Sequence, residues 1–248
     1  MNDRPKLHIG PKHITFIRNI GKTDLHHHAA VTLLIGLSGE IEVSTRDQSA
    51  QCRAVLIDAN EPHTIDCKGQ TIAAIFFEID SNAVIILKNQ FLTSSAFFTS
   101  FPTSHLLTKK NEKKILEGLF DFLFPNLRDK TPHRELDSRI THCIELVRNK
   151  PDLSQQMLAE QLNISASRLT HLFKSETGTP YRRYKLWTQL KCFVNDYTST
   201  NSLASSAVHA GFYDSSHLCK AFNSLLGINP LRGLQNLRNS YTPSSPEQ

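Results

Sequence analysis

The second half of the chain contains one pattern twice, and this repeat restricts the fold more than any other feature. In each copy an N-cap residue, a Leu, a Phe and a Gly keep the same spacing. The first copy has Ser165, Leu169, Phe173 and Gly178, and the second has Asp214, Leu218, Phe222 and Gly227. Ser and Asp cap helix starts and Gly ends helices, so each copy predicts a capped helix. A shorter helix capped by Ser154 or Ser202 precedes each one, which makes two helix-turn-helix units.

The second helix of each unit has a polar outer face suited to nucleic acid. Short hydrogen-bonding side chains and a cation can reach base edges and nearby phosphates. A connecting helix from Pro180 to about Asp196 would span roughly 25 Å and could place both units on one DNA face. The alternative interpretation is a plain helical bundle with a solvated polar face. The four residues that keep the same spacing in both copies favour two helix-turn-helix units instead. The outward residues are Ala166, Ser167, Thr170, His171 and Lys174, then Ser215, Ser216, Cys219 and Lys220.

The first eighty residues show a different pattern, in which short strands are separated by polar or Gly-containing turns. Such spacing favours an antiparallel sandwich or barrel. The segments are HITFIRNI (13–20), VTLLIGL (31–37), GEIEVSTR (39–46), RAVLID (53–58), HTIDC (63–67) and TIAAIFFEID (71–80).

These patterns predict an α+β chain of two domains. A β domain (1–103) precedes a helix and linker (104–132), a helical domain (133–238) and a polar tail (239–248) that we expect to be disordered. Within 108–124, apolar residues share one helical face that could dimerise or pack on the chain's own β domain, and Pro-bracketed residues 125–133 mark the boundary. The apolar residues are Ile115, Leu116, Leu119, Phe120 and Leu123.

Composition indicates the compartment of the protein and the kind of partner that it binds. No apolar run approaches the roughly 18 residues of a membrane span, and no signal peptide is recognisable, so we predict a cytoplasmic protein without membrane contact. Five cysteines without C-x-x-C spacing argue against disulfides or a zinc knuckle. The net charge is +5, and residues 133–248 hold 13 Lys and Arg against 9 Asp and Glu, which is compatible with a polyanionic partner.

The segments LAEQLNISASRLTHLFKSETGTPYRRYKLWTQL and AVHAGFYDSSHLCKAFNSLLGINP resemble the DNA-binding domain of AraC/XylS-type transcription regulators over about residues 137–237. The resemblance implies double-stranded DNA as partner. It places base contacts on Ser167, Thr170, His171, Ser215, Ser216 and Lys220, and phosphate or packing roles on Arg168 and Lys174. Gln189 and Asn223 replace residues that are usually basic in the family, so the second unit should bind phosphates weakly. The most specific positions are Ala207, Gly211, Phe212, Asp214, Ser216, Phe222, Gly227 and Pro230.

The β domain is similar to cupin barrels at two motifs. GKTDLHHHAAVTLLIGLSG supplies His26 and His28, and DANEPH ends on His63. Three neutral imidazoles could converge on a metal, but a metal-binding cupin has Glu where Thr32 stands, so we predict neither a metal nor another cofactor. The resemblance implies a small-molecule effector near His26, His28, Thr32 and His63, and a homodimer through the helices that follow. His27 should point away from these histidines and be exposed.

The leading hypothesis is a sequence-specific DNA-binding transcription regulator controlled by an effector in the β domain, without catalytic activity. A cupin metalloenzyme with a helical appendage is one alternative. An adaptor whose helical half binds protein is the other.

Overall fold

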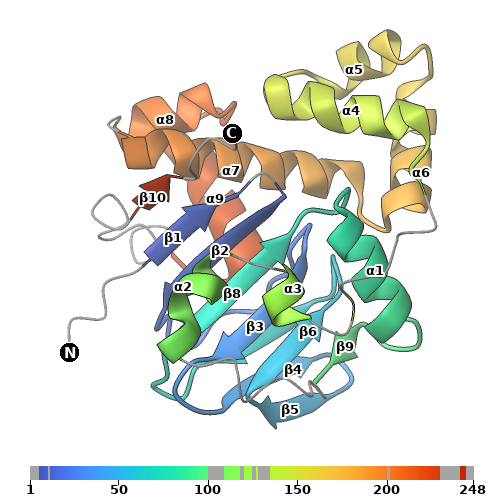
Figure 1. The fold of residues 1–248 in the computed structure, drawn as a ribbon. Coiled ribbons are helices and arrows are strands. Elements are labelled where there is room, and N and C mark those ends of the chain that lie inside the picture. Colours follow the sequence, from blue (N-terminus) through green and yellow to red (C-terminus); the bar gives the residue numbers. More distant parts are fainter. Residues whose placement is uncertain are drawn as a thin grey trace.

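A computed structural model describes residues 6–10, 12–99, 109–117, 120–124, 127, 135–199, 202–229 and 241–243. A β domain of two sheets is followed by a helical domain, as predicted (Figure 1). The larger sheet has the order β10-β1-β2-β8-β3-β6-β9, and the smaller has β5-β4-β7. The strands are β1 Lys6–Ile9, β2 His13–Arg18, β3 Val31–Gly36, β4 Ile41–Thr45, β5 Ser49–Cys52, β6 Ala54–Ile57, β7 His63–Asp66, β8 Ile72–Phe77, β9 Phe97–Phe98 and β10 Tyr241–Pro243.

All six predicted strands are confirmed as β2, β3, β4, β6, β7 and β8, and they pair antiparallel. The pattern missed β1, β5 and β9, which are short and lie at or near sheet edges. It also missed helix α1, Asn82–Phe91, which Ser81 caps by accepting a hydrogen bond from the Val84 N–H. Three residues of the tail that we expected to be disordered form β10, which pairs in parallel with β1.

The single helix predicted within 108–124 is wrong, because the structure has three short elements there. They are η2 Lys109–Asn111, α2 Glu112–Leu116 and α3 Phe120–Leu123. Gly118, a poor helix former, follows Glu117 at the end of α2. Ile115 and Leu123 are buried against the β domain's own sheet, so the predicted homodimer would need other residues. Leu119 and most of the predicted linker 125–133 lie outside the described residues.

The helices of the helical domain begin where the sequence predicted, and the connecting helix ends at Ser199 rather than near Asp196. Side chains of Asp137, Ser154, Ser165, Ser202 and Asp214 each accept a backbone N–H from the first turn of the helix that follows. Gly178 and Gly227 end two of them with φ of 74° and 65°. The helices are α4 Ser138–Asn149, α5 Gln155–Gln161, α6 Ala166–Thr177, α7 Tyr181–Ser199, α8 Leu203–His209 and α9 Ser215–Leu226.

The two helix-turn-helix units belong to different hydrophobic cores. Leu169 and Phe173 of α6 belong to a core formed mainly by α4, α5 and the start of α7. Leu218 and Phe222 of α9 instead share one core with the interior of the β domain. The connecting helix α7 lies across one end of the β domain, and α9 lies between α7 and the larger sheet (Figure 1). The second unit is therefore built onto the β domain, whereas the core of the first is mainly helical and has Ile79 as its buried residue from the β domain.

Candidate functional site

The outer face of α6 presents most of the residues predicted to contact DNA. Ser167, Arg168, His171 and Lys174 are exposed. Thr170 is half-buried. Its hydroxyl donates to the Ala166 carbonyl oxygen at 3.0 Å and accepts from Gln155 Nε2 at 2.8 Å. These bonds hold the Thr170 side chain in one orientation and tie α6 to α5.

The N-terminal part of α9 presents the corresponding residues of the second unit. Ser215, Ser216, Cys219 and Lys220 are all exposed. Asp214 fixes the start of the helix by accepting the His217 N–H at 2.7 Å. Both units therefore expose the polar faces that the repeat predicted.

The C-terminal end of α9 is docked on the β domain, which the sequence did not predict. His28 Nδ1 lies 2.9 Å from the Leu225 carbonyl oxygen, and the Asp24 N–H donates to the Gly227 carbonyl oxygen at 2.9 Å. A Cβ atom on Gly227 would lie 2.4 Å from His26 Nδ1 and 2.6 Å from the Asp24 carbonyl oxygen. Only glycine fits at this contact.

Arg183 of α7 adds a second connection between α9 and the β domain. Its guanidinium donates to the His27 carbonyl oxygen at 2.8 Å, to Ser224 Oγ at 2.7 Å and to the Ser224 carbonyl oxygen at 3.1 Å. Burial lowers the pKa of Arg183 to about 10, so the group stays charged at neutral pH. Three elements thus meet at one guanidinium.

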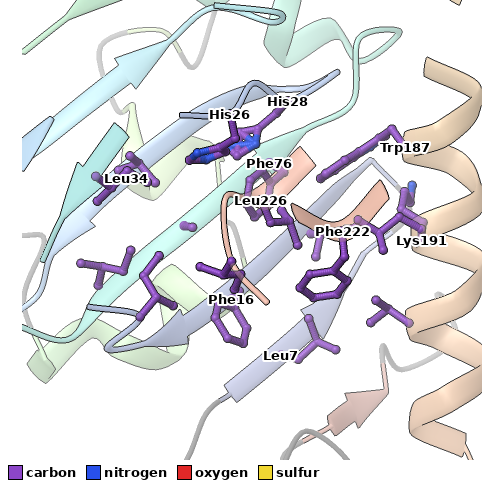
Figure 2. Close-up of a pocket in the computed structure, with 18 residues that line it drawn as sticks. Leu7, Phe16, His26, His28, Leu34, Phe76, Trp187, Lys191, Phe222 and Leu226 are labelled. Carbon is purple, nitrogen blue, oxygen red and sulfur yellow. The ribbon is translucent and has the colours of Figure 1, made fainter. Parts of the chain in front are cut away.

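A cavity lies between the β domain and helices α7 and α9 (Figure 2). It holds about 770 Å³ of empty space when the open solvent at its mouth is counted. Its wall is apolar except for two histidines, one lysine and the indole of Trp187, the only Trp of the chain. The lining residues are Leu7, Ile14, Phe16, Ile20, His26, His28, Leu34, Ile65, Ile72, Ala74, Phe76, Trp187, Leu190, Lys191, Val194, Phe222, Leu226 and Ile228.

His26, His28 and His63 form a buried cluster at one side of this cavity. Their ring centroids lie 4.4 to 4.8 Å apart. Burial is the main cause that lowers the pKa of His26 to about 3, that of His63 to about 4, and that of His28 well below its usual value. All three imidazoles are therefore neutral at pH 7.

The four residues predicted for the effector site have different positions. His26 and His28 line the cavity, whereas Thr32 and His63 are not among its lining residues. Thr32 is buried, and its hydroxyl donates to the Ala30 carbonyl oxygen at 3.3 Å. The prediction that His27 is exposed is wrong: it is half-buried, because its ring packs beside Asn60, with Nδ1 2.9 Å from Oδ1.

A buried charge cluster also joins the domains, and the sequence reasoning missed it. Glu78, 1% exposed, lies 2.6 Å from Lys191 Nζ and 3.0 Å from Arg148 Nη2. Arg148 also contacts Asp80 at 2.7 Å. An acidic residue directly after the apolar run of β8 was the available signal, since a carboxylate there must be exposed or paired.

Comparison with known proteins agrees with this architecture. Residues 158–235 match the family described as "Helix-turn-helix domain". No curated protein matches the chain. Among solved structures, an apo form of a ToxT variant from Vibrio cholerae is similar with a TM-score of 0.62 at 11% identity, over 93% of this chain and 99% of that chain. ToxT from Vibrio cholerae O395 has a TM-score of 0.61 at 13% identity, over 92% and 99%.

A third similar structure contains a ligand. It is wild-type ToxT from Vibrio cholerae bound to an unsaturated fatty acid, with a TM-score of 0.56 at 11% identity over 98% of this chain and 100% of that chain. Identities this low show a common fold. Among the described residues, no helix has the length and apolar character to cross a membrane.

The repeated units, their exposed faces and the family match define a helix-turn-helix DNA-binding protein. More closely, the C-terminal domain is of the AraC type, and the chain is a DNA-binding transcription regulator with the two-domain fold of ToxT.

Proposed function

We propose that this regulator binds a small, mainly apolar effector in the cavity between its domains, and that the effector changes DNA affinity through α9. One observation carries this proposal: the second DNA-facing helix is also a wall of the cavity. Phe222 and Leu226 of α9 line the cavity, while Ser216 and Lys220 of the same helix are exposed. An effector that packs against Phe222 therefore acts on a helix that presents residues to DNA.

The lining indicates the chemistry of the effector. Apolar walls favour an apolar body, since burial contributes about 25 cal/mol for each Å² removed from water. Lys191 is the cationic side chain in the wall, and it already pairs with Glu78 at 2.6 Å. An acidic end group could share this lysine. Because a ToxT structure holds an unsaturated fatty acid, long-chain unsaturated fatty acids are the first compounds to test here.

Fluorescence of Trp187 tests effector binding directly, because this cavity residue is the only Trp of the chain. We expect a saturable change on titration with oleate, and weaker binding in Ala74→Leu, which fills part of the cavity. Ala204→Leu makes the same change at an exposed site of α8 and serves as control. Equal affinities in both variants would argue against this cavity.

Coupling to DNA is tested by measuring both ligands together. The effector should change operator affinity by a factor equivalent to about 1 to 3 kcal/mol, and DNA should change effector affinity by the same factor. Effector binding without any effect on DNA affinity would refute the regulatory part of the proposal.

For DNA we propose that the short polar residues of α6 and α9 contact base edges, while longer cations contact phosphates. Their exposure and their repeated arrangement support this assignment. The base-contacting set is Ser167, Thr170, His171, Ser215 and Ser216, and the phosphate set is Arg168, Lys174 and Lys220, which the family resemblance would also allow at a base.

Selection of genomic DNA fragments by the full chain, followed by sequencing, tests this assignment. Two enriched blocks about one helical turn apart are expected if both units contact bases. One enriched block would show that the second unit has only a structural role. No enrichment, with or without fatty acid, would refute sequence-specific binding.

A further inference from the structure

The histidine cluster formed by His26, His28 and His63 has a property that neither DNA binding nor an apolar effector explains. The Nε2 atom of each ring is buried and has no hydrogen-bond partner among the described residues. The three side chains are 1 to 3% exposed. One ring nitrogen of each histidine lies within 4.8 Å of those of the other two. Three buried polar atoms without partners, on three rings packed against one another, are costly unless something binds them.

The hydrogen bonds made by the three Nδ1 atoms determine the protonation of the Nε2 atoms, and so what the Nε2 atoms can bind. Each Nδ1 lies 2.8 or 2.9 Å from a backbone carbonyl oxygen, on Asp24, Leu225 and Glu61 respectively. A carbonyl oxygen only accepts, so each Nδ1 must carry the proton. Each Nε2 of these neutral rings therefore has a free lone pair. Three lone pairs cannot satisfy one another, but they can satisfy a cation.

We propose that His26, His28 and His63 bind one divalent transition metal ion, such as Zn²⁺, through their Nε2 atoms. Three imidazoles and one open position form a known zinc arrangement that needs no carboxylate. The sequence prediction of no metal relied on Thr32 at the place of a Glu, and a three-histidine set removes that objection. Bonds of about 2.0 to 2.1 Å would require each ring to move inward by roughly 0.8 Å.

The proposed site lies against the second DNA-facing helix. A backbone carbonyl that accepts from a ligand histidine orients the ring, and for His28 this carbonyl belongs to Leu225 of α9. The backbone of Gly227, directly after α9, packs against the His26 ring. A bound ion would therefore stabilise α9 in its docked position, independently of any effector.

Metal uptake by the untagged full chain, stripped with a chelator, is the first measurement. We expect one Co²⁺ per chain, with the visible absorption of a tetrahedral site, and displacement by Zn²⁺. Trp187 adds a local probe, because its ring centroid lies 6.4 Å from that of His28. Co²⁺ in the cluster should quench this fluorescence, whereas Co²⁺ at surface histidines should not.

Substitutions of single histidines identify the residues that bind the metal. His63→Ala removes one ligand without touching α9, and should abolish stoichiometric uptake and quenching. His63→Cys should restore binding, with a new thiolate-to-cobalt absorption band. His142→Gln changes an exposed histidine of α4 and should leave uptake unchanged. Circular dichroism checks that each variant is folded.

Two results would overturn the site: folded wild-type chain that takes up no stoichiometric metal, or uptake that His63→Ala leaves unchanged. Neither measurement uses DNA or fatty acid, so a failure here leaves the proposed function standing, and the reverse also holds.

Discussion

Replacing the buried Glu78 by Gln should weaken the connection between the two domains strongly. Glu78 is 1% exposed and contacts Lys191 at 2.6 Å and Arg148 at 3.0 Å. Removing one partner of a buried ion pair costs about 3 to 5 kcal/mol, because the other charge stays buried without compensation. Arg148 keeps Asp80 at 2.7 Å, so Lys191 bears most of the loss. We therefore expect the free energy of unfolding at pH 7 to fall by about 3 kcal/mol.

Urea unfolding followed by Trp187 fluorescence measures this change at the contact itself, since Trp187 Nε1 donates to Glu78 Oε1 at 3.3 Å. Circular dichroism of the same samples shows whether both domains unfold together. Glu42→Gln is the matched control. Glu42 also lies 2.6 Å from a lysine, Lys68, but the two side chains are 34% and 45% exposed. This exposed pair should contribute under about 1 kcal/mol. Similar losses in the two variants would refute the argument from burial.

Acid should weaken the same connection, because the stability that ionised carboxylates contribute is lost when they are protonated. Burial alone would raise the pKa of Asp80, but hydrogen bonds from Arg148 and Lys12 outweigh it and lower the pKa to about 2. Burial likewise opposes ionisation of Glu78, but Lys191 and Arg148 outweigh it and lower its pKa. Carboxylates with depressed pKa values stabilise the fold above their unfolded pKa. Wild-type stability should fall as pH drops from about 5 to 2, and Glu78→Gln should lose less over this range.

Three further substitutions test α9. Gly227→Ala should cost about 2 to 4 kcal/mol of unfolding free energy, because alanine is strained at this positive φ and its Cβ would overlap His26 and Asp24; a cost below about 1 kcal/mol would contradict the docked geometry. Lys220→Ala should weaken binding to all DNA sequences and lower the slope of log affinity against log salt by about 1, and an unchanged slope would exclude a phosphate contact. Ser216→Ala should cost about 1 to 3 kcal/mol at one base position, and a uniform loss across sequences would contradict a base contact.

Local signals explain why the helical domain could be predicted so closely. Ser154, Ser165 and Ser202 each cap a helix through contacts within four residues, and Gly178 ends one through its own φ. Such features depend on near neighbours in the sequence. The missed strand β5 has the sequence SAQC, which is only four residues long and has no large apolar side chain, and pairing with β4 makes it a strand.

The site was only partly predictable, because its essential contacts join distant segments. The exposed residues of α6 and α9 follow from helical periodicity, and the three histidines stand out by residue type. The bond between His28 and Leu225 links positions 197 residues apart, and no local pattern encodes it. Phe222 and Leu226 have the spacing of ordinary helical core residues, so the sequence does not show that their core is the interior of the β domain.

The two DNA-facing units therefore differ in what holds them. The first has a mainly helical core around Phe173 and carries Arg168 and Lys174 on α6. The second shares its core with the β domain, and Lys220 is the only Lys or Arg in the sequence of α9. A unit with little charge gains little from phosphates, so its contribution depends on how accurately it is positioned. Because the β domain positions α9, a change in its interior should alter binding by the second unit more than by the first.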